Sequence, residues 1–339
     1  MKAKITLLAT IISLCANSVW AKSNELDTIK SRAYVICGTD LSTKSLAYKD
    51  ADGIWQGIDA DICRNFAAAI LGNSEAFKLM NVSLKKAIPY LNDKKIDIML
   101  GNTSLSAGQE AQYSALAIGE LYFDKQVFVA REQASATSMD EYKGEKVCVM
   151  ANSADYSNLN AYNNKYGMEF KLLQFPDMNA VKQAFYLNRC KLASGSEIYF
   201  KGIEGTLVAK NNTTVILPET IAIRPIFAYT SKKNFNMQIA GKWIVNAPKL
   251  AEQNKINKNN TEAFISVKDD SVRNLLGFDT ALWTSFNLNP SWALQAIKER
   301  GNFEEMFEKN LGKESAIDLE RGPNNLIENG GLISALPFI

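Results

Sequence analysis

The residues best suited to chemistry in this sequence are the hydroxyl and amide side chains of one short loop. The loop 102–109, NTSLSAGQ, follows the apolar run KIDIML and carries Ser104, Ser106 and Gln109. Small polar side chains at the end of a buried strand can donate and accept hydrogen bonds to a small molecule. The loop therefore indicates a ligand-binding site.

The sequence contains few residues suited to catalysis. The chain contains no histidine, and no HExxH, GxSxG or phosphate-loop signature occurs in it. Acid–base chemistry would have to rest on carboxylates, Lys or Tyr, and Asp59 and Asp61 are better explained as acids in the first turn of a helix. No cluster of metal ligands is visible in the sequence. We therefore expect no enzyme, no metal and no cofactor.

Residues 1–21 have the pattern of a secretory signal peptide, with two lysines, an apolar run over 5–14 and a small-residue end at Ala21. Leu14 is too bulky for a lipoprotein cleavage site before Cys15, so we expect a product without a lipid anchor. Loss of the two lysines lowers the formal charge from +2 to zero. Neither nucleic acid nor an anionic membrane is therefore suggested as a partner.

Four cysteines remain after the signal peptide: Cys37, Cys63, Cys148 and Cys190. An even number in an oxidising compartment argues for two disulfides, with three possible pairings. The spacing favours Cys37–Cys63 and Cys148–Cys190, each worth about 3 to 4 kcal/mol in the chain-entropy model. The competing interpretation is that the thiols are buried and unpaired.

Predicted strands alternate with predicted helices along the chain. The apolar runs RAYVICGTD and KIDIML are strands, and GIDADICRNFAAAILG is a helix that stops at Gly72. The alternation of strand and helix starts again at KVCVMANS. A strand–helix alternation of this kind is typical of an open parallel sheet, so the two occurrences predict an α/β fold. Two extended stretches flank this second unit. They predict two lobes joined by a hinge, and 339 residues suffice for two cores.

Several of these segments resemble the periplasmic solute-binding proteins of general L-amino-acid ABC importers, which are family 3 extracellular solute-binding proteins. They are GIDADICRNFAAAILG, IDIMLGNTS, YFDKQVFVA, VCVMANS and the long tail that runs from LGFDTALW to ISALPF. The resemblance covers nearly the whole exported chain. Its four cysteines also match in position, which supports the pairing given above.

The resemblance implies a type II periplasmic-binding-protein fold: two α/β lobes with hinge strands between them, closing on a small solute. Lobe 1 is expected at 24–125 and 228–339, and lobe 2 at 126–227, with the hinge near 126–131 and 221–228. The implied partners are an amino acid or derivative and an inner-membrane ABC permease. The implied state is a periplasmic monomer.

The resemblance also implies how the solute is held. In this family an arginine grips the α-carboxylate, an acid takes the α-ammonium, and the turn before a helix adds backbone N–H groups. Carried onto this sequence, the positions that would contact the solute are Ser104, Ser106, Gln109, Ser153, Asp155 and Ser196.

Three of these positions depart from the family pattern. Gln109 stands at the arginine position and cannot form a charged fork, Ser196 stands at the acid position, and Asp155 stands where a small hydroxyl residue is usual. An ordinary free α-amino acid is therefore a poor match. A neutral, cationic or blocked amino-acid derivative fits the altered pocket better.

A second interpretation stays open at each of these positions. Arg131 or Arg224 could supply the missing cation, Glu197 could supply the missing acid after a shift in register, and Asp155 could act as a helix N-cap. Tyr122 could face the cleft. The alternative function is a degenerate receptor that acts as a sensor or interaction module without transport. A dehydratase-like enzyme on the same fold is the remote alternative.

Overall fold

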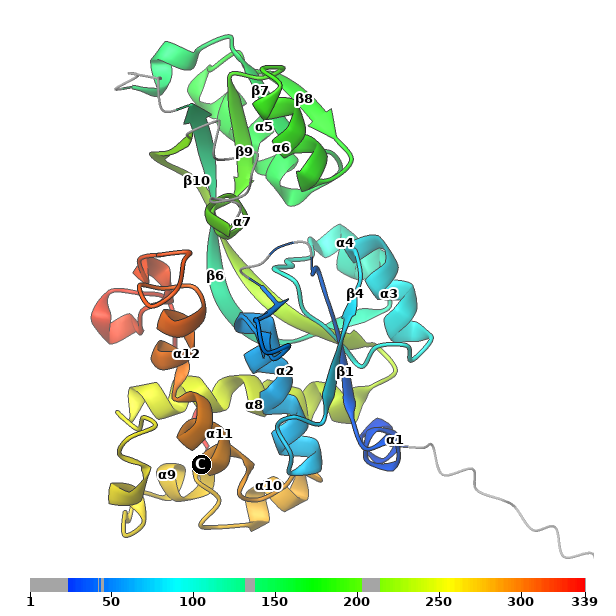
Figure 1. Cartoon of the computed structure of the whole chain (residues 1–339), viewed down its shortest axis with the longest axis vertical. Helices are drawn as coiled ribbons and strands as arrows, with labels where there is room; N and C mark the ends of the chain where they lie inside the picture. The colour runs from blue at the N-terminus through cyan, green and yellow to red at the C-terminus, as the bar shows by residue number, and fades with distance from the viewer. Residues whose placement is uncertain (1–23, 42, 44–45, 132–137, 203–213, 339) are drawn as a thin grey trace, which may run out of the picture.

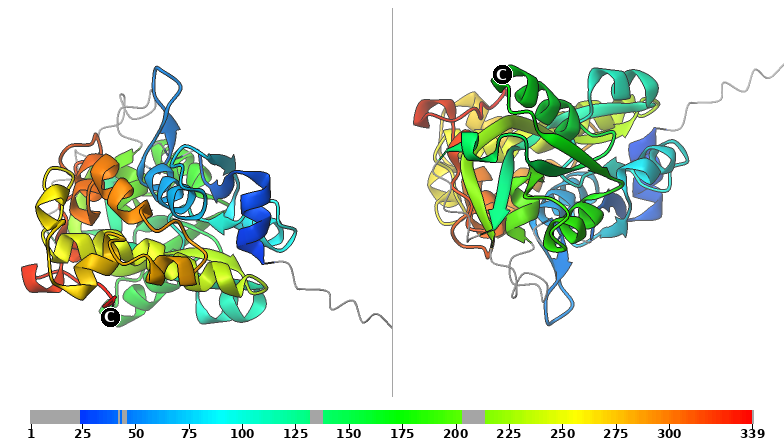
Figure 2. Two further views of the ribbon diagram at one scale, coloured as in Figure 1. Left: turned by 90° about the horizontal axis from the view of Figure 1, so that it is seen from below. Right: turned by 90° about the horizontal axis from the view of Figure 1, so that it is seen from above.

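The computed structural model describes residues 24–41, 43, 46–131, 138–202 and 214–338. Figure 1 shows two bodies, one above the other, joined by a pair of long strands. The two views in Figure 2 look along that long axis from below and from above. These bodies are the two lobes of the type II fold, and one continuous sheet passes through both of them with the strand order β4-β1-β5-β10-β6-β9-β7-β8.

The lower body contains three parallel strands, β1 (Val35–Thr39), β4 (Phe77–Asn81) and β5 (Ile98–Met99). Its helices from the first half of the chain are α1 (Glu25–Arg32), α2 (Ile58–Leu71), α3 (Leu84–Asn92) and α4 (Ala107–Gln112). A small hairpin of β2 (Tyr48–Lys49) and β3 (Trp55–Gln56) precedes α2. Residues of α2 and α3 belong to separate core clusters in this body, and β1 contributes to both.

The upper body repeats the arrangement with three parallel strands, β7 (Lys146–Met150), β8 (Lys171–Phe175) and β9 (Leu192–Ser196). Its helices are η1 (Met139–Tyr142), α5 (Ala154–Tyr166), α6 (Met178–Tyr186) and α7 (Glu197–Gly202). The parallel sheet that the sequence begins twice is thereby confirmed.

Two strands connect the bodies: β6 (Ala115–Arg131) and β10 (Thr214–Ser231). They pair antiparallel along almost their whole length, with register irregularities between Ile216 and Ala222 and again between Ile226 and Tyr229. In the upper body, Val127 and Val129 face one core cluster, while Phe128 and Ala130 face another. This alternation follows from the two-residue period of a strand that is covered on both faces.

The chain returns from β10 into the lower body and ends in a helical region (Figure 1). Its elements are α8 (Phe235–Gln253), η3 (Thr261–Phe264), α9 (Asp270–Leu275), α10 (Ala281–Ser285), α11 (Trp292–Arg300), α12 (Phe303–Asn310), η4 (Gly322–Asn324) and η5 (Ile327–Asn329). Helices α8, α11 and α12 pack with α2 in the largest core cluster. The two ends of the chain thus build one lobe together.

Helix α2 is fixed at both ends by glycine. Gly57 precedes it at φ 106°, and Gly72 follows it in the left-handed conformation at φ 71°. The first-turn acids Asp59 and Asp61 are both buried, so the helix terminus alone does not explain them. Asp61 lies 3.1 Å from Arg64 and 3.0 Å from Lys309, so it ties α2 to α12.

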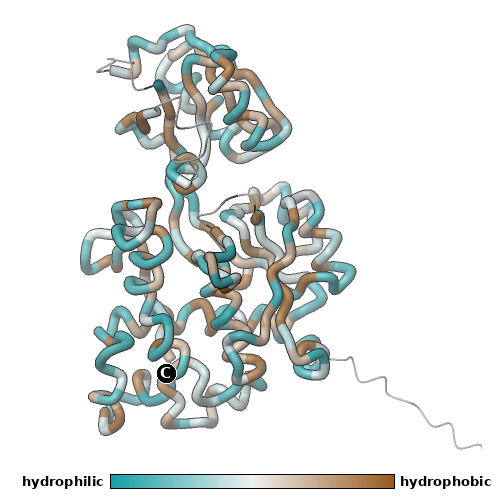
Figure 3. The backbone as a smooth tube through the Cα atoms, viewed as in Figure 1, coloured by the Kyte–Doolittle hydropathy of each residue, from teal (hydrophilic) through white to brown (hydrophobic). Residues whose placement is uncertain are grey.

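The predicted disulfide pairing is confirmed. Cys37 of β1 is bonded to Cys63 of α2, and Cys148 of β7 is bonded to Cys190, which lies just before β9. Hydrophobic residues are spread through both bodies in Figure 3, as expected for two separate cores. Among the described residues, no helix combines the length and the apolar character needed to cross a bilayer.

Candidate functional site

Parallel strands from both lobes end at the junction between the bodies. Met99 at the end of β5 pairs with Tyr229 of β10, and Ser196 at the end of β9 pairs with Gln126 of β6. In open α/β sheets, ligands bind outside the carboxyl ends of the strands, where the strand order switches. The segments that follow β5, β7 and β9 are therefore the first place to look for a solute site.

Five polar residues meet there, and we call them the interlobe cluster: Asn102, Asp124, Asp155, Ser196 and Arg224. Asp124 and Arg224 are cross-strand partners on β6 and β10. The Arg224 guanidinium donates from Nη1 to Asp155 Oδ1 at 2.9 Å and from Nη2 to Asp124 Oδ2 at 2.5 Å. One arginine is thus held between an acid of the hinge and an acid of the upper lobe.

Asn102 connects this ion-paired group to both lobes. Its amide nitrogen donates to Asp124 Oδ2 at 3.0 Å and to Ser196 Oγ at 2.9 Å. Asn102 follows β5 and has φ 53°, a left-handed conformation that asparagine tolerates better than most residues. Ser196 Oγ also accepts from the Tyr199 backbone N–H at 3.0 Å, which fixes the start of α7.

The charged members of the cluster are largely out of water. The side chains of Asp124, Asp155 and Arg224 are 0%, 4% and 13% exposed. Burial alone would lower the pKa of the Arg224 guanidinium, but Asp155 and Asp124 outweigh it, so that pKa lies above its ordinary value. Burial raises the pKa of Asp155, Arg224 opposes that shift and Asp124 adds to it.

A third buried acid, Asp59, lies outside the cluster. Asp59 accepts from the Thr39 hydroxyl and from the Gly101 backbone N–H, yet its burial raises the pKa of the carboxyl to about 7. Tyr122 is also fully buried, and its pKa is raised well above the ordinary value by burial and by the charges of Asp59 and Asp124.

Four buried polar atoms in this region have no hydrogen-bond partner among the described residues. They are Asp59 Oδ1, Asn102 Oδ1, Tyr122 OH and Arg224 Nε. Buried polar groups are normally hydrogen-bonded, and exceptions often mark a place for water or a ligand. The neighbourhood of the interlobe cluster therefore has unused hydrogen-bonding capacity.

The loop predicted to grip the ligand has a local structural role. Ser106 caps α4. The Ser106 backbone N–H donates to the Gln109 side-chain oxygen at 2.9 Å, so the two residues form a capping box. Ser106 is exposed, while Ser104 and Gln109 are half-buried. Among the described residues, no hydrogen bond joins these three side chains to the interlobe cluster.

The interpretation of Asp155 as an N-cap is wrong. Ser153 is the N-cap of α5 and accepts from the Tyr156 backbone N–H at 3.1 Å, while Asp155 is in the first turn and turns its carboxylate to Arg224. The Asp155 carboxylate therefore pairs with the buried Arg224 guanidinium and does not cap the helix. Of the residues implied by the resemblance, the structure brings Asp155 and Ser196 into one cluster.

The two arginines that could supply the missing cation lie in different places. Arg131, at the far end of β6, donates to the Phe185 carbonyl and stacks on its ring, whereas Arg224 lies in the cluster. Glu197, considered as a replacement acid, lies 3.7 Å from Lys125. Tyr122 is a core residue, with its ring against the apolar side of α2 and α12.

Two members of the cluster, Asn102 and Asp124, were not identified from the sequence as ligand contacts. The sequence does contain a signal for Asp124, because it is the one acid in the strand run LYFDKQVFV, which is mostly apolar. A charge inside a buried strand requires a partner. That partner, Arg224, lies 100 positions further along the chain, so only the pairing of β6 with β10 reveals it.

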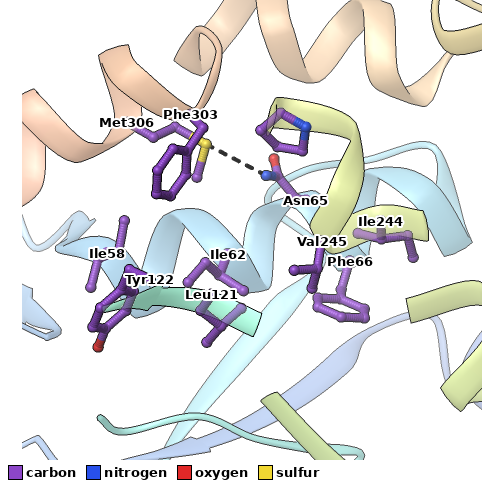
Figure 4. Close-up of a pocket in the computed structure, with 11 residues that line it drawn as sticks. Ile58, Ile62, Asn65, Phe66, Leu121, Tyr122, Ile244, Val245, Phe303 and Met306 are labelled. Atoms are coloured by element: carbon purple, nitrogen blue, oxygen red, sulfur yellow. Dashed lines mark hydrogen bonds between the residues drawn. The ribbon is translucent and has the colours of Figure 1, made fainter. Parts of the chain in front are cut away.

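An apolar pocket in the lower lobe is too small for a solute. Figure 4 shows it between α2, β6, α8 and α12, with the Tyr122 hydroxyl pointing away from Phe303 and Met306. Its volume is about 20 Å³, which is close to the space for one water molecule. In the part of the chain that the structure describes, no group of three or more His, Cys, Asp or Glu side chains could hold a metal ion.

Two α/β lobes on paired hinge strands, with a polar cluster where the strand ends face each other, define a solute receptor of the type II periplasmic-binding class. Residues 35–313 match the model of the bacterial extracellular solute-binding proteins, family 3. The chain belongs to this family, whose members are receptors rather than enzymes.

Individual relatives agree with this assignment over nearly their full length. The chain is 29% identical to YhdW of Escherichia coli (strain K12), provisionally named an amino-acid ABC transporter-binding protein, over 97% of this chain and 96% of that one. It is 27% identical to the glutamate/glutamine/aspartate/asparagine-binding protein BztA of Rhodobacter capsulatus, over 94% of each.

The structure is also similar to a periplasmic binding protein from Brucella ovis solved with glutathione bound. The TM-score is 0.85 at 26% identity, and the match covers 93% of this chain and 99% of the other. The similarity therefore includes both lobes and the C-terminal helical region.

Proposed function

We propose that this protein captures an amino-acid-type solute at the interlobe cluster and delivers it to an inner-membrane ABC permease. The solute lies between a lobe formed by 24–125 with 228–339 and a lobe formed by 126–227. The exported form is a periplasmic monomer without its first 21 residues. The loop with Ser104, Ser106 and Gln109 borders the cleft from the lower lobe, and the turn that begins at Ser153 borders it from the upper lobe.

The interlobe cluster is the observation that carries this proposal. Asn102 follows a lower-lobe strand, Ser196 ends an upper-lobe strand, and a 2.9 Å hydrogen bond joins them. A solute that enters here meets groups from both lobes and favours their closure. The relatives named for amino acids and the neighbour with bound glutathione support the same class of solute.

The altered pocket is part of the proposal. Gln109 offers no charge, and the guanidinium of Arg224 is already bound by two acids. A free α-carboxylate therefore lacks a ready partner, and common L-amino acids are expected to bind weakly. Derivatives in which the carboxylate is absent or blocked are expected to bind more tightly.

Thermal unfolding of the purified exported chain tests the function. The panel contains L-amino acids, amines, short peptides including glutathione, and sugars, each at millimolar concentration. A ligand at 100 times its Kd stabilises the folded state by about 2.7 kcal/mol, so binding raises the Tm measurably. Stabilisation by sugars alone, with none from amino compounds, would contradict the proposal.

A glycine substitution then locates the binding site. Asn102→Gly removes the amide that links the lobes and still permits φ 53°, so the ligand-induced rise in Tm should shrink. Asn188→Gly is the matched control, because Asn188 is exposed and has φ 60°. An equal ligand-induced rise in Tm in both variants would show that the ligand binds outside the interlobe cluster.

Radiolabelled uptake distinguishes transport from a sensor role. Cells that lack the receptor gene should lose uptake of the solute identified in the thermal screen, and the restored gene should recover it. Unchanged uptake together with intact binding in vitro would favour a receptor that no longer serves transport.

A further inference from the structure

The charges of the interlobe cluster do not balance. It contains one guanidinium, Arg224, and two carboxylates, Asp124 and Asp155, all largely buried. Removing a charge from water is unfavourable unless an opposite charge compensates it. With both acids ionised, the cluster holds one more negative charge than positive charge, and that surplus is shielded from solvent.

Arg224 does not present a free fork to an incoming anion. Both of its terminal nitrogens already donate to carboxylates, Nη1 to Asp155 and Nη2 to Asp124. Of the three guanidinium nitrogens, only Nε has no partner among the described residues, and bidentate capture of a ligand carboxylate requires two nitrogens that point at the ligand. A ligand carboxylate would also have to displace or face the two acids. Arg224 is thus an internal counter-ion.

The chain also places a carboxylate of its own in the first turn of α5. Helix N-termini favour anions, and Asp155 places its own carboxylate in the first turn. A solute carboxylate near this turn would meet a negative charge that the chain supplies itself. The arginine of the family pattern is therefore replaced by Gln109, and the turn before α5 lies beside a carboxylate of the chain.

In the described part of the chain, the cluster has one unused acceptor and one unused donor, Asn102 Oδ1 and Arg224 Nε. Asn102 Oδ1 is buried with no partner among the described residues. Among the described residues, the Asp155 carboxylate accepts through Oδ1, from Arg224. The Tyr122 hydroxyl is unpartnered as well, and the charges of Asp59, Asp124 and Arg224 all act on it.

We infer that the solute presents an alkylammonium or guanidinium group to Asp155 and Asn102, and that it lacks a free α-carboxylate beside that group. The cation completes the charge balance of the cluster, and its N–H donors supply the missing hydrogen bonds. This inference rests on the proposed function, because it names the class of solute for the same cleft.

Two matched pairs of probes test the inference by calorimetry on the exported chain. Agmatine is L-arginine without its carboxylate, and cadaverine is L-lysine without its carboxylate. At least one amine should bind at least tenfold more tightly than its parent amino acid, a difference of about 1.4 kcal/mol. Glutathione serves as a probe with two carboxylates and should bind more weakly than the better amine.

A charge-neutralising variant then tests the role of Asp155. Asp155→Asn keeps an oxygen for Arg224 but removes the surplus negative charge, so amine affinity should fall at least tenfold and the preference over the parent amino acid should shrink. Asp269→Asn is the control, because this residue caps α9 in the helical region and asparagine caps equally well. The Asp269→Asn variant should bind each probe with the same affinity as the unaltered protein.

The outcomes separate the inference from the function on which it rests. Tighter binding of L-arginine, L-lysine or glutathione than of both amines would overturn the cationic-solute inference and leave the amino-acid-type receptor standing. Binding of none of the five probes would overturn the inference and also count against the receptor function. The probe series uses the unaltered protein, so its result stands even if Asp155→Asn fails to fold.

Discussion

At the scale of single residues, Asp59 makes the stability of the folded protein depend on pH. Its carboxyl is fully buried and accepts from Thr39 and Gly101, but one oxygen has no partner among the described residues. Burial raises its pKa from 3.8 to about 7. Between these two values, the folded protein holds a proton at Asp59 that the unfolded chain has released.

This difference predicts a loss of stability as pH rises. Because the folded state binds the extra proton, the Asp59 contribution to the free energy of unfolding falls from about pH 4 to about pH 7, by about 2 to 3 kcal/mol between pH 5 and pH 8. Asp59→Asn should remove this part of the decline. Urea denaturation at both pH values measures it.

The exposed acid Asp52 provides the comparison for that experiment. Asp52→Asn should leave the difference in stability between pH 5 and pH 8 as it is in the unaltered protein. The same pH profile in Asp59→Asn as in the unaltered protein would mean that Asp59 remains ionised in the folded state throughout this range.

Gly57 illustrates a residue fixed by backbone geometry. Its φ of 106° is strained for any residue with a side chain, and an added Cβ would lie 2.4 Å from the Leu46 carbonyl oxygen. That carbonyl accepts from the Asp59 backbone N–H at 3.0 Å, so the close approach sets the start of α2.

Gly57→Ala should therefore destabilise the fold by at least about 3 kcal/mol, because backbone strain and a clash with backbone add together. Gly53→Ala is the matched comparison, with φ 79° and open space around the added Cβ. It should cost only about 1 kcal/mol. Equal costs in denaturant titrations would show that the contact with Leu46 relaxes easily.

At the scale of elements, each lobe has one disulfide that ties a central strand to a neighbouring segment. Cys37–Cys63 closes a separation of 26 residues, and Cys148–Cys190 closes one of 42. The largest core cluster lies in the lower lobe, so the upper lobe relies more on its covalent link. The chain-entropy model assigns about 4 kcal/mol to the longer loop.

Replacement of both Cys148 and Cys190 by serine should lower the stability of the upper lobe by about 3 to 4 kcal/mol. Protection against proteolysis should fall first within 126–227, while β1 and α2 in the lower lobe stay protected. Mass spectrometry of limited digests measures this order. First cleavage in the lower lobe would contradict an independent contribution of the bond to its own lobe.

At the scale of the whole molecule, two strands and the interlobe cluster are the main connections between the lobes at the junction. The Arg224–Asp155 ion pair and the Asn102–Ser196 hydrogen bond both lie beside β6 and β10. Groups close to a hinge move little when the lobes rotate, so these contacts can persist during closure. The cleft can then narrow without breaking its own polar network.

Ligand binding should reduce the radius of gyration measured by small-angle X-ray scattering. The physical reason is that a solute gains contacts from both lobes only when they approach each other. The measurement uses a compound that raises the Tm in the thermal screen, at saturating concentration. An unchanged radius with that compound bound would rule out hinge closure as the response.

Much of this fold follows from local sequence patterns. The order of strands and helices, Gly72 at the end of α2 and the two disulfides are determined by periodicity, helix stop signals and cysteine number together with the family resemblance. The two extended stretches likewise predict the hinge strands. The strand and helix order depends on residues close together in the chain, while the disulfide pairing follows from the cysteine number and the family resemblance, so a single sequence contains the information.

The charge chemistry of the site was decided only by the tertiary structure. Asp124, Asp155 and Arg224 are far apart in the chain, and each could be a surface residue if considered alone. The pairing of β6 with β10 and the turn before α5 bring them within ion-pair distance and out of water. Burial and proximity fix their charge balance, and neither is a property of any local segment. The sequence by itself therefore determined the receptor architecture, while the tertiary structure decided which charges come together in the interlobe cluster.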